Sequence, residues 1–451
     1  MLSRSSKTYE LITVGFGPAA LAVAAAIDDA VRAGELPRSM GDDVLFLEKQ
    51  VETKWQGGLL LPGTNINHSA LRDLATPRDP ASPYTFARYL KQKGRLYEHG
   101  AWSGAVGRIE WSDYVSWAAA QLDAYVAYGE PVEAIELDCD GTLCVISART
   151  RYRTRRLMLA CGMEPYCPPV LDALPDDRMR HSGSYLYYRG AIDARIRESD
   201  NRPFRIAIVG SGLSAAEIMH DLLDRHDSDR IAVTSIHRGL AFRQYDMSQF
   251  SNQIYMPPEV DRFAAAAAET RRKLFEKTWA TNFSGVDAEC SAREYNFLYE
   301  RRLMGIDNAT LIDRHEIVNA SATANGVLLE LADMLEVEKT RPFEFDFVIA
   351  ATGYQDTAPE RLLRPIAAEI EHEFDGRLAI DRSYRLRTSQ RVTTPIFLNG
   401  HCEHTHGIAD TQSFSLIAFK AEQLLGAMFY SPVRAAALQS SSAAHGLAAI
   451  R

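Results

Sequence analysis

The sequence predicts an α/β fold with two Rossmann-like domains and a small helical module. Two glycine-rich turns carry this prediction, because each follows an apolar strand and opens a helix. Leu11–Leu21 reads LITVGFGPAAL, and Arg205–Glu217 reads RIAIVGSGLSAAE. Glycines in such turns let the backbone bend sharply beside a pyrophosphate, and a third small residue lets helix and strand pack closely. Two turns of this kind indicate one domain that holds a flavin and another that holds a nicotinamide.

The residues of the two turns are the first predicted cofactor-binding positions. They are Gly15, Gly17, Pro18, Ala20, Gly210, Gly212, Ser214 and Ala215.

Length and composition exclude several classes of protein. With roughly 150 residues per domain, 451 residues predict two or three domains. Apolar residues make up 46% and the net charge is -9, which argues against a disordered chain and against a nucleic-acid surface. No apolar run approaches the ~20 residues that span a bilayer. We therefore expect a soluble, cytosolic protein without a membrane or nucleic-acid partner.

The six cysteines form no CxxC motif and have no zinc-site spacing. In a cytosolic chain this predicts reduced thiols and no metal site. The absence of CxxC also weighs against a disulfide reductase, a frequent relative with two nucleotide domains.

In the first domain we expect a strand over Tyr9–Val14, a helix over Pro18–Val31 and a strand over Asp43–Leu47 that ends at Glu48. An acid at this strand end normally accepts hydrogen bonds from a ribose. Residues 49–100 are predicted to be irregular, and a loop of this length is more often functional than idle.

Apolar spacing predicts a helix over Ser112–Tyr128, β-hairpins over Pro131–Leu159 and a strand over Arg156–Cys161 that returns to the first domain. In the second domain, the strand Arg230–Ile236 is followed by His237 and Arg238 rather than by an acid. A base there accommodates the 2′-phosphate of NADP, so Arg238, and as a further candidate Arg243, are the predicted contacts.

The last part of the chain completes the predicted organisation. Helices are expected over Asp261–Trp279 and Asp287–Met304, and strands over Phe343–Ala351 and Pro395–Asn399; His404–Met428 begins as a loop and becomes a helix. The first domain is assigned residues 1–175 and 340–430. The second is assigned 176–339, with a helical insertion around 255–310, and 431–451 form a low-complexity tail.

Several spaced motifs point to one family. Lys49–Arg95 resembles the substrate loop of the microbial N-hydroxylating flavin monooxygenases, the L-ornithine N5- and L-lysine N6-hydroxylases of siderophore biosynthesis. Asp246–Pro257, Thr281–Ser284 and His406–Thr411 resemble three further motifs of that family, and Ala351–Tyr354 resembles one shared more widely among flavin monooxygenases. The resemblance spans roughly residues 9 to 425.

The resemblance implies FAD, NADPH and O2 as the reactants that oxidise a small amine. NADPH reduces FAD, O2 adds to form a C4a-hydroperoxyflavin, and oxygen passes to a neutral side-chain amine, so the protein itself binds, orients and excludes water. Members of the family are often tetrameric, so a homo-oligomer, dimer or tetramer, is expected.

By position in these motifs, Asn67, Arg72, Asn252 and Asn282 are the expected substrate-binding residues. Arg72 corresponds to the lysine that binds the α-carboxylate. Asn252 corresponds to the asparagine that contacts the substrate and the nicotinamide, and Asn282 to the asparagine that binds the amino acid end of the substrate. Both are also expected catalytic residues. The remaining expected cofactor-binding positions are Glu48, Lys49, Trp55, Gln56, Arg238, Thr352, Gly353, Tyr354, His406 and Asp410.

Departures from the family pattern cluster in the substrate loop. Arg72 replaces lysine, Ala70 replaces a bulky phenylalanine, Asn67 replaces glutamine and Gln56 replaces histidine, while residues 412–415 do not align cleanly. Arginine and lysine are not interchangeable in a carboxylate clamp. L-Ornithine is the expected substrate, and lysine, a diamine or another amine with an acidic group stays open.

Two other classes remain as alternatives. A sulfur- or ketone-oxidising flavin monooxygenase would carry the fingerprint FxGxxxHxxxW/P between the two nucleotide turns, and this stretch is not found. A flavoprotein that only binds or senses is disfavoured by the intact turns and asparagines.

Overall fold

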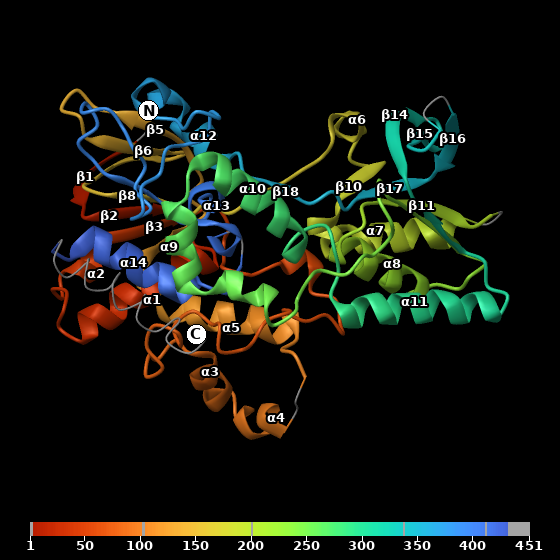
Figure 1. The fold of residues 1–451 in the computed structure, drawn as a ribbon, viewed down its shortest axis with the longest axis horizontal. Helices are drawn as coiled ribbons and strands as arrows, with labels where there is room; N and C mark the ends of the chain where they lie inside the picture. The colour runs from red at the N-terminus through yellow and green to blue at the C-terminus, as the bar shows by residue number, and fades with distance from the viewer. Residues whose placement is uncertain (1–2, 102–103, 200–201, 337–338, 411–412, 432–451) are drawn as a thin grey trace.

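A computed structural model describes residues 3–101, 104–199, 202–336, 339–410 and 413–431. Two lobes lie side by side along the long axis of the molecule, each built around a parallel β-sheet (Figure 1). The predicted α/β class with two Rossmann-like domains is confirmed. Apart from Ser431, the predicted low-complexity tail lies outside the described residues.

The first lobe contains a parallel sheet whose five strands, in spatial order, are β19 (Ile396–Leu398), β8 (Leu157–Leu159), β2 (Leu11–Val14), β3 (Val44–Glu48) and β4 (Val126–Tyr128). The chain runs from β2 outward through β3 and β4, and later returns on the other side through β8 and β19. The strand order therefore reverses beside β2, and ligands of such sheets bind in the crevice at this point. The first glycine turn directly follows β2.

Helices α1 (Pro18–Arg32), α5 (Arg108–Gln121) and α14 (Ile417–Phe429) belong to the apolar core of this lobe. Residues 20–26 of α1, mostly alanines, are fully buried, and small side chains of this kind allow close packing against the sheet and α14. The predicted helix Ser112–Tyr128 instead begins at Arg108 after the N-cap Gly107 and ends at Gln121. A 3-10 turn and β4 occupy the remainder of that range.

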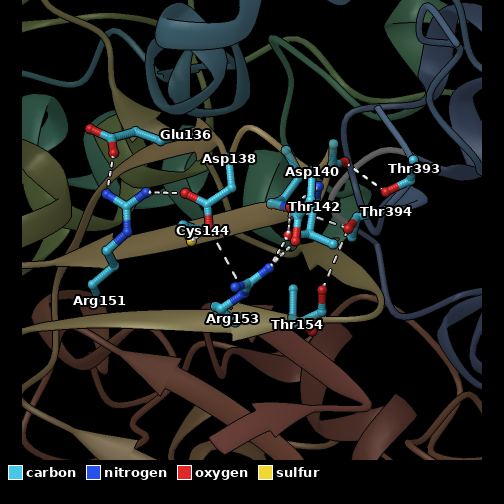
Figure 2. Close-up of polar contacts among 12 residues, drawn as sticks. Glu136, Asp138, Asp140, Thr142, Cys144, Arg151, Arg153, Thr154, Thr393 and Thr394 are labelled. Carbon is cyan, nitrogen blue, oxygen red and sulfur yellow. Dashed lines mark hydrogen bonds and ion pairs between the residues drawn. The ribbon is translucent and has the colours of Figure 1, made fainter. Parts of the chain in front are cut away.

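A second sheet of the first lobe has the order β1 (Ser3–Tyr9), β7 (Thr150–Thr154), β6 (Leu143–Ser147) and β5 (Val132–Leu137). Its β5, β6 and β7 are the predicted hairpins. Figure 2 shows the ion pairs on this sheet, in which Arg151 contacts Glu136 at 2.5 Å and Asp138 at 2.7 Å. Thr393 donates to the Gly141 carbonyl at 2.8 Å, which fastens the chain just before β19.

The second lobe repeats this organisation around β11, with the spatial order β10 (Met179–His181), β17 (Phe347–Ala350), β11 (Phe204–Val209), β12 (Ile231–Ile236) and β13 (Ala309–Ile312). Helices α7 (Tyr185–Glu198), α8 (Leu213–Arg225) and α11 (Ala288–Leu303) pack on it, and β14 (His315–Thr323), β15 (Gly326–Asp333) and β16 (Thr340–Phe345) form an antiparallel sheet. The second glycine turn follows β11, again where the strand order reverses.

The segment predicted as one strand, Phe343–Ala351, is two strands in two sheets. Asp346 separates them, and its buried carboxylate contacts Arg202 at 2.5 Å and accepts the Arg205 N–H at 2.7 Å. Both strands belong to the second lobe, so the return to the first lobe begins after Ala350 rather than at residue 340.

The predicted helix Asp261–Trp279 is two helices, α9 (Pro257–Ala265) and α10 (Ala268–Thr278). Ala266 between them is extended, with φ -76° and ψ 151°. Arg271 compensates for the break, because it donates to the Ala266 carbonyl at 3.0 Å and to Glu373 at 2.7 Å. Both helices also contact α13 (Glu403–His406), so tertiary packing overrides the helix propensity of alanine.

The remaining short elements are α2 (Met40–Asp43), α3 (Phe86–Gln92), α4 (Leu96–Ala101), α6 (Pro169–Asp172), α12 (Ala358–Leu363), β9 (Glu164–Pro165) and β18 (Tyr354–Gln355). Residues 49–100, predicted to be irregular, therefore contain α3 and α4. Part of this segment reaches the second lobe, where Leu59 and Leu61 join the apolar core. No helix of the described residues is long and apolar enough to cross a membrane. All six cysteines are free.

Candidate functional site

A cavity of about 1540 Å³ lies between the two lobes and is lined by both glycine turns. At the first turn, Gly15 has a φ of +95°, and a Cβ there would lie 2.4 Å from the Ala160 carbonyl oxygen. Gly17 and Pro18 line the cavity, whereas Ala20 is buried beneath the turn. Gly17 and Pro18 are therefore placed to face a ligand, and Ala20 is the small residue that lets helix and strand pack closely.

Glu48 stands at the end of β3 and is fixed by the backbone of the first turn. Its carboxylate accepts hydrogen bonds from the Phe16 N–H at 2.7 Å and from the Gln50 N–H at 2.8 Å. Glu48 and Gln50 line the cavity, and the exposed Lys49 does not. Successive side chains of an extended segment point to opposite sides, which explains why Lys49 does not line the cavity although both of its neighbours do, and its contact with a cofactor stays a prediction.

The second turn has the same close approach of backbone to backbone. Gly210 has a φ of +135°, and a Cβ there would lie 2.1 Å from the Ala351 carbonyl oxygen. Gly212 and Ser214 line the cavity, and Ala215 is buried between helix and sheet. Residues 352–354, from Thr352 to Tyr354, line the same cavity where the chain crosses between the lobes.

Two arginines near the end of β12 also line the cavity. Arg238 and Arg243 are exposed, and neither side chain forms an ion pair or hydrogen bond with other described residues. Unpaired guanidinium groups beside a dinucleotide turn can bind a phosphate bidentately.

Arg72 is a half-buried cation that lines the cavity. Its Nη1 donates to the Ser415 hydroxyl at 2.9 Å, and its guanidinium lies 5.8 Å from the centre of the Tyr255 ring. Burial lowers the pKa of Arg72, although an arginine remains charged at neutral pH. Among the described residues it has no carboxylate partner. Such a group is suited to bind the carboxylate of a ligand.

The three predicted asparagines line the same cavity as Arg72. Asn67 adopts a left-handed φ of 56°, and its N–H donates to the Asn65 side chain at 2.9 Å. Asn252 donates to the Met247 carbonyl at 3.1 Å. Asn282 accepts a hydrogen bond from the Tyr255 hydroxyl at 3.2 Å, so Tyr255 contacts both Arg72 and Asn282.

Aromatic rings cover the wall of the cavity beside Asn282. Trp279 and Phe283 stack with their ring centres 4.2 Å apart, and Phe275 meets Trp279 edge-on at 5.7 Å. Apolar rings of this kind are typical of the walls of small-molecule sites, although Trp279 itself stays 43% exposed.

His68 is held neutral beside Arg72. Its ring stacks on Phe414 at 5.5 Å and meets Trp111 edge-on at 5.1 Å. The pKa of His68 is lowered to about 4, mainly by burial, and the nearby charge of Arg72 contributes to that shift. Its Nδ1–H donates to the Ser69 carbonyl at 3.0 Å in the neutral tautomer that this contact assigns.

Asp410 lies between the cavity and α14. It forms a buried ion pair with Lys420, whose Nζ lies 4.8 Å above the Tyr384 ring. Burial raises the pKa of the Asp410 carboxyl, and Lys420 opposes that shift. The Asp410 Oδ2 is buried and has no hydrogen-bond partner among the described residues. A cofactor with ring N–H groups therefore fits beside it.

His406, predicted to bind a cofactor, does not line the cavity. Its side chain is 1% exposed, its ring stacks on Tyr384 at 4.1 Å, and its Nε2 donates to the Arg382 carbonyl at 3.3 Å. Burial holds the pKa of His406 well below its usual range. The orientation of α13 makes it a packing residue. Thr411, the last residue of this motif, and Gln412 lie outside the described residues.

Sequence reasoning missed the residues that support these side chains. The residues Tyr255, Ser415, Lys420, Arg108 and Glu217 contact predicted positions or each other. Two signals were available, since Ser415 stood in the stretch that aligned poorly and Tyr255 in the Asp246–Pro257 motif. In the part of the chain that the structure describes, no group of three or more metal-ligating side chains is found.

Comparison with known proteins gives consistent matches over the length of the chain. Residues 7–356 match the family described as L-lysine 6-monooxygenase/L-ornithine 5-monooxygenase. An L-ornithine N(5)-monooxygenase of Pseudomonas aeruginosa is 33% identical over 93% of this chain and 94% of its own.

Two solved structures have closely similar folds. An L-lysine 6-monooxygenase from Pseudomonas syringae is 33% identical with a TM-score of 0.82, over 95% of this chain and 99% of its own. An ornithine N-hydroxylase from Kutzneria sp. 744 was solved with reduced FAD, NADP+ and L-ornithine. It is 27% identical with a TM-score of 0.85, over 94% of this chain and 99% of its own.

Proposed function

The chain belongs to the L-lysine 6-monooxygenase/L-ornithine 5-monooxygenase family, and we propose that it hydroxylates N5 of L-ornithine with FAD, NADPH and O2. The observation that carries the proposal is the half-buried Arg72, which lines the cavity without a carboxylate partner among the described residues. An amino acid substrate supplies that carboxylate, and its side-chain amine can then project along the cavity.

The strand order of each parallel sheet reverses once, beside β2 and beside β11, and these two places support one cofactor in each lobe. FAD would lie along the first turn with Glu48 at a ribose and Asp410 near the flavin ring, and NADPH along the second turn with Arg238 at the 2′-phosphate. The bound flavin, reduced by NADPH, supplies the oxidising chemistry with O2. The chain itself contributes positions, hydrogen bonds and a dry environment.

The roles of the substrate residues follow from their positions. Arg72, preset by Ser415 and Tyr255, binds the α-carboxylate. Asn252 and Asn282 orient the substrate through amide oxygens and N–H groups, and Asn67 contributes from the facing segment. The aromatic wall of Phe275, Trp279 and Phe283 keeps water from the alkyl chain and the amine, which must be neutral to react.

Overall identity does not separate ornithine from lysine, because relatives named for each substrate are both 33% identical. Arg72 favours ornithine, since arginine reaches further into the cavity than the lysine of the family pattern and leaves less length for the substrate. A diamine has no carboxylate for Arg72. We further propose that the N-hydroxylated product serves siderophore or related natural-product biosynthesis, as the family resemblance suggests.

The test is hydroxylamine formation by the holoenzyme with NADPH, against L-ornithine, L-lysine, putrescine and cadaverine. Coupled product with ornithine supports the proposal. Product with lysine or a diamine, and only hydrogen peroxide with ornithine, would show that Arg72 and the altered loop select another amine. NADPH oxidation without any hydroxylamine would contradict N-hydroxylation altogether.

A further inference from the structure

A buried ion pair joins the two lobes, and its Arg108 lines the cavity between them. Arg108, the first residue of α5, contacts Glu217 of α8 with both terminal nitrogens, at 2.8 Å and 2.9 Å. The two residues are 6% and 4% exposed. Burial of two charges is costly and does not by itself favour folding, so a pair of this geometry is better explained by a positioning role.

One end of the pair belongs to the second glycine turn. Glu217 lies in the early turns of α8, whose N-cap is Gly212. Since Gly212 and Ser214 line the cavity, a dinucleotide bound there contacts the same short stretch of helix that carries Glu217.

The other end of the pair belongs to the amino-acid pocket. The Arg108 Nε donates to the Asn65 carbonyl at 3.0 Å, and the Arg108 N–H donates to the Thr64 carbonyl at 3.0 Å. Asn65 in turn accepts the Asn67 N–H, which sets the left-handed backbone of that residue. A single guanidinium therefore connects α8 to the segment that presents Asn67 and Arg72.

We propose that Arg108 and Glu217 are a positioning pair that couples dinucleotide binding at the second glycine turn to the shape of the amino-acid pocket. When NADP+ orders the start of α8, the pair holds Asn65, and through it residues 64–68, in the geometry that accepts the substrate. Because allosteric coupling is reciprocal, a bound amino acid tightens NADP+ binding by the same factor. The inference rests on the proposed function only for the identity of the amino acid.

The environment of Glu217 makes this pair sensitive to pH. Burial raises the pKa of Glu217 to about 7, while Arg108 of α5 and Arg293 of α11 oppose the shift and Asp287 at the N-cap of α11 adds to it. Tyr245 and Cys290 also face this group. Protonation as the pH falls through about 7 neutralises the carboxylate, so coupling decreases on the acid side.

The first test is hydrogen–deuterium exchange of the FAD-loaded enzyme at pH 8, with and without NADP+. We expect NADP+ to protect peptides covering residues 60–70 in the unaltered protein, and Glu217→Gln to lose this protection while it still binds NADP+. Equal protection in both, or none in the unaltered protein, would overturn the proposal. This measurement needs no amino acid substrate.

The second test measures L-ornithine binding calorimetrically with and without saturating NADP+. We expect NADP+ to tighten binding by roughly fivefold or more in the unaltered enzyme, and by a factor near one in Glu217→Gln. A pH series from 8 to 6 should reduce the coupling in the unaltered enzyme and leave Glu217→Gln flat. Failure of ornithine to bind at all, with NADP+ protection intact, would reject the proposed substrate and not the pair.

Two further variants keep the tests informative. Glu136→Gln makes the same substitution at an Arg–Glu pair on the sheet of β1, β7, β6 and β5 (Figure 2). Glu136 does not line the cavity, so this variant should keep full coupling. Arg108→Lys retains the charge but cannot make the bidentate contact with Glu217. It replaces Glu217→Gln in both tests if Glu217→Gln fails to fold. Full coupling in folded Arg108→Lys would also contradict the proposal.

Discussion

The Arg72 guanidinium donates a hydrogen bond of 2.9 Å to the Ser415 hydroxyl, although 343 positions separate the two residues in the chain. The contact joins the long segment after β3 to the stretch just before α14. With Tyr255 at its other side, the guanidinium is held in place before a ligand arrives, and its remaining N–H groups can bind a carboxylate.

Removal of this cation should weaken substrate binding without affecting the cofactors. We expect Arg72→Ala to raise the KM for L-ornithine by roughly 10- to 100-fold, as loss of a charge-assisted hydrogen bond implies. Flavin reduction by NADPH, followed as loss of flavin absorbance, should stay within about twofold. The control is Arg153→Ala, which removes an exposed ion pair on the sheet of β1, β7, β6 and β5 and should leave the KM for L-ornithine unchanged. An unchanged KM in Arg72→Ala would remove Arg72 from the substrate site.

Cofactor preference should depend on the basic residue after β12. Arg238→Ala removes an unpaired guanidinium from the cavity, so the KM for NADPH should rise by at least about 10-fold and that for NADH by less than about twofold. Steady-state kinetics with both nucleotides measures this difference, and Arg243→Ala tests the neighbouring candidate separately. Equal changes for NADPH and NADH would exclude a 2′-phosphate contact at Arg238.

The Asp410–Lys420 pair should be critical for stability. Lys420→Met leaves a buried carboxylate without its counter-charge, which we expect to lower the free energy of unfolding by about 3–5 kcal/mol at pH 8. The loss should shrink toward pH 5, because burial raises the pKa of Asp410 and a protonated carboxyl needs no cation. Urea denaturation measures both values. Lys91→Met, at an exposed position, should change the free energy by less than about 0.5 kcal/mol.

His68 should make stability depend on pH in a defined window. Its pKa is about 4 in the folded protein and about 6.5 when unfolded, so the unfolded chain binds more protons between these values. The contribution is complete above pH 6.5 and is lost as the pH falls toward 4, by an amount on the order of 3 kcal/mol.

The slope of unfolding free energy against pH tests this expectation. His68→Gln should flatten the slope between pH 6.5 and 4, while His372→Gln, at an exposed histidine, should leave it unchanged. Identical slopes in all three proteins would show that His68 does not titrate in this way.

Asn282 should determine how much hydroxylamine is formed for each NADPH that is oxidised. It lies in the cavity against Tyr255 and beside the aromatic wall, so Asn282→Ala should misplace the substrate amine. We expect NADPH oxidation to continue while the hydroxylamine formed per NADPH falls by about fivefold or more, with hydrogen peroxide as the difference. Unchanged coupling would exclude this positioning role.

The elements that could be read from the sequence are those fixed by short-range geometry. Each glycine turn needs a strand before it, a positive φ within it and small residues after it, and all three requirements fall within about a dozen positions. The position of Glu48 could be predicted in the same way, because this residue ends the strand next to the first turn. Lys49 and His406 lie close to residues that line the cavity but do not line it themselves, since the direction of a side chain depends on the exact end of a strand or the orientation of a short helix.

By itself, the sequence determined the α/β class and the two nucleotide turns at their strand ends, and it pointed to residues near them that line the cavity. Only the tertiary structure decided which distant groups support those residues: Ser415 at Arg72, Lys420 at Asp410, and Arg108 at Glu217. The tertiary structure also decided that the alanine-rich segment is interrupted at Ala266 and that the strands before and after Asp346 belong to different sheets. The physical reason is that backbone periodicity depends on neighbouring residues, whereas these contacts depend on how separate elements pack, as for Arg72 and Ser415, which are 343 positions apart.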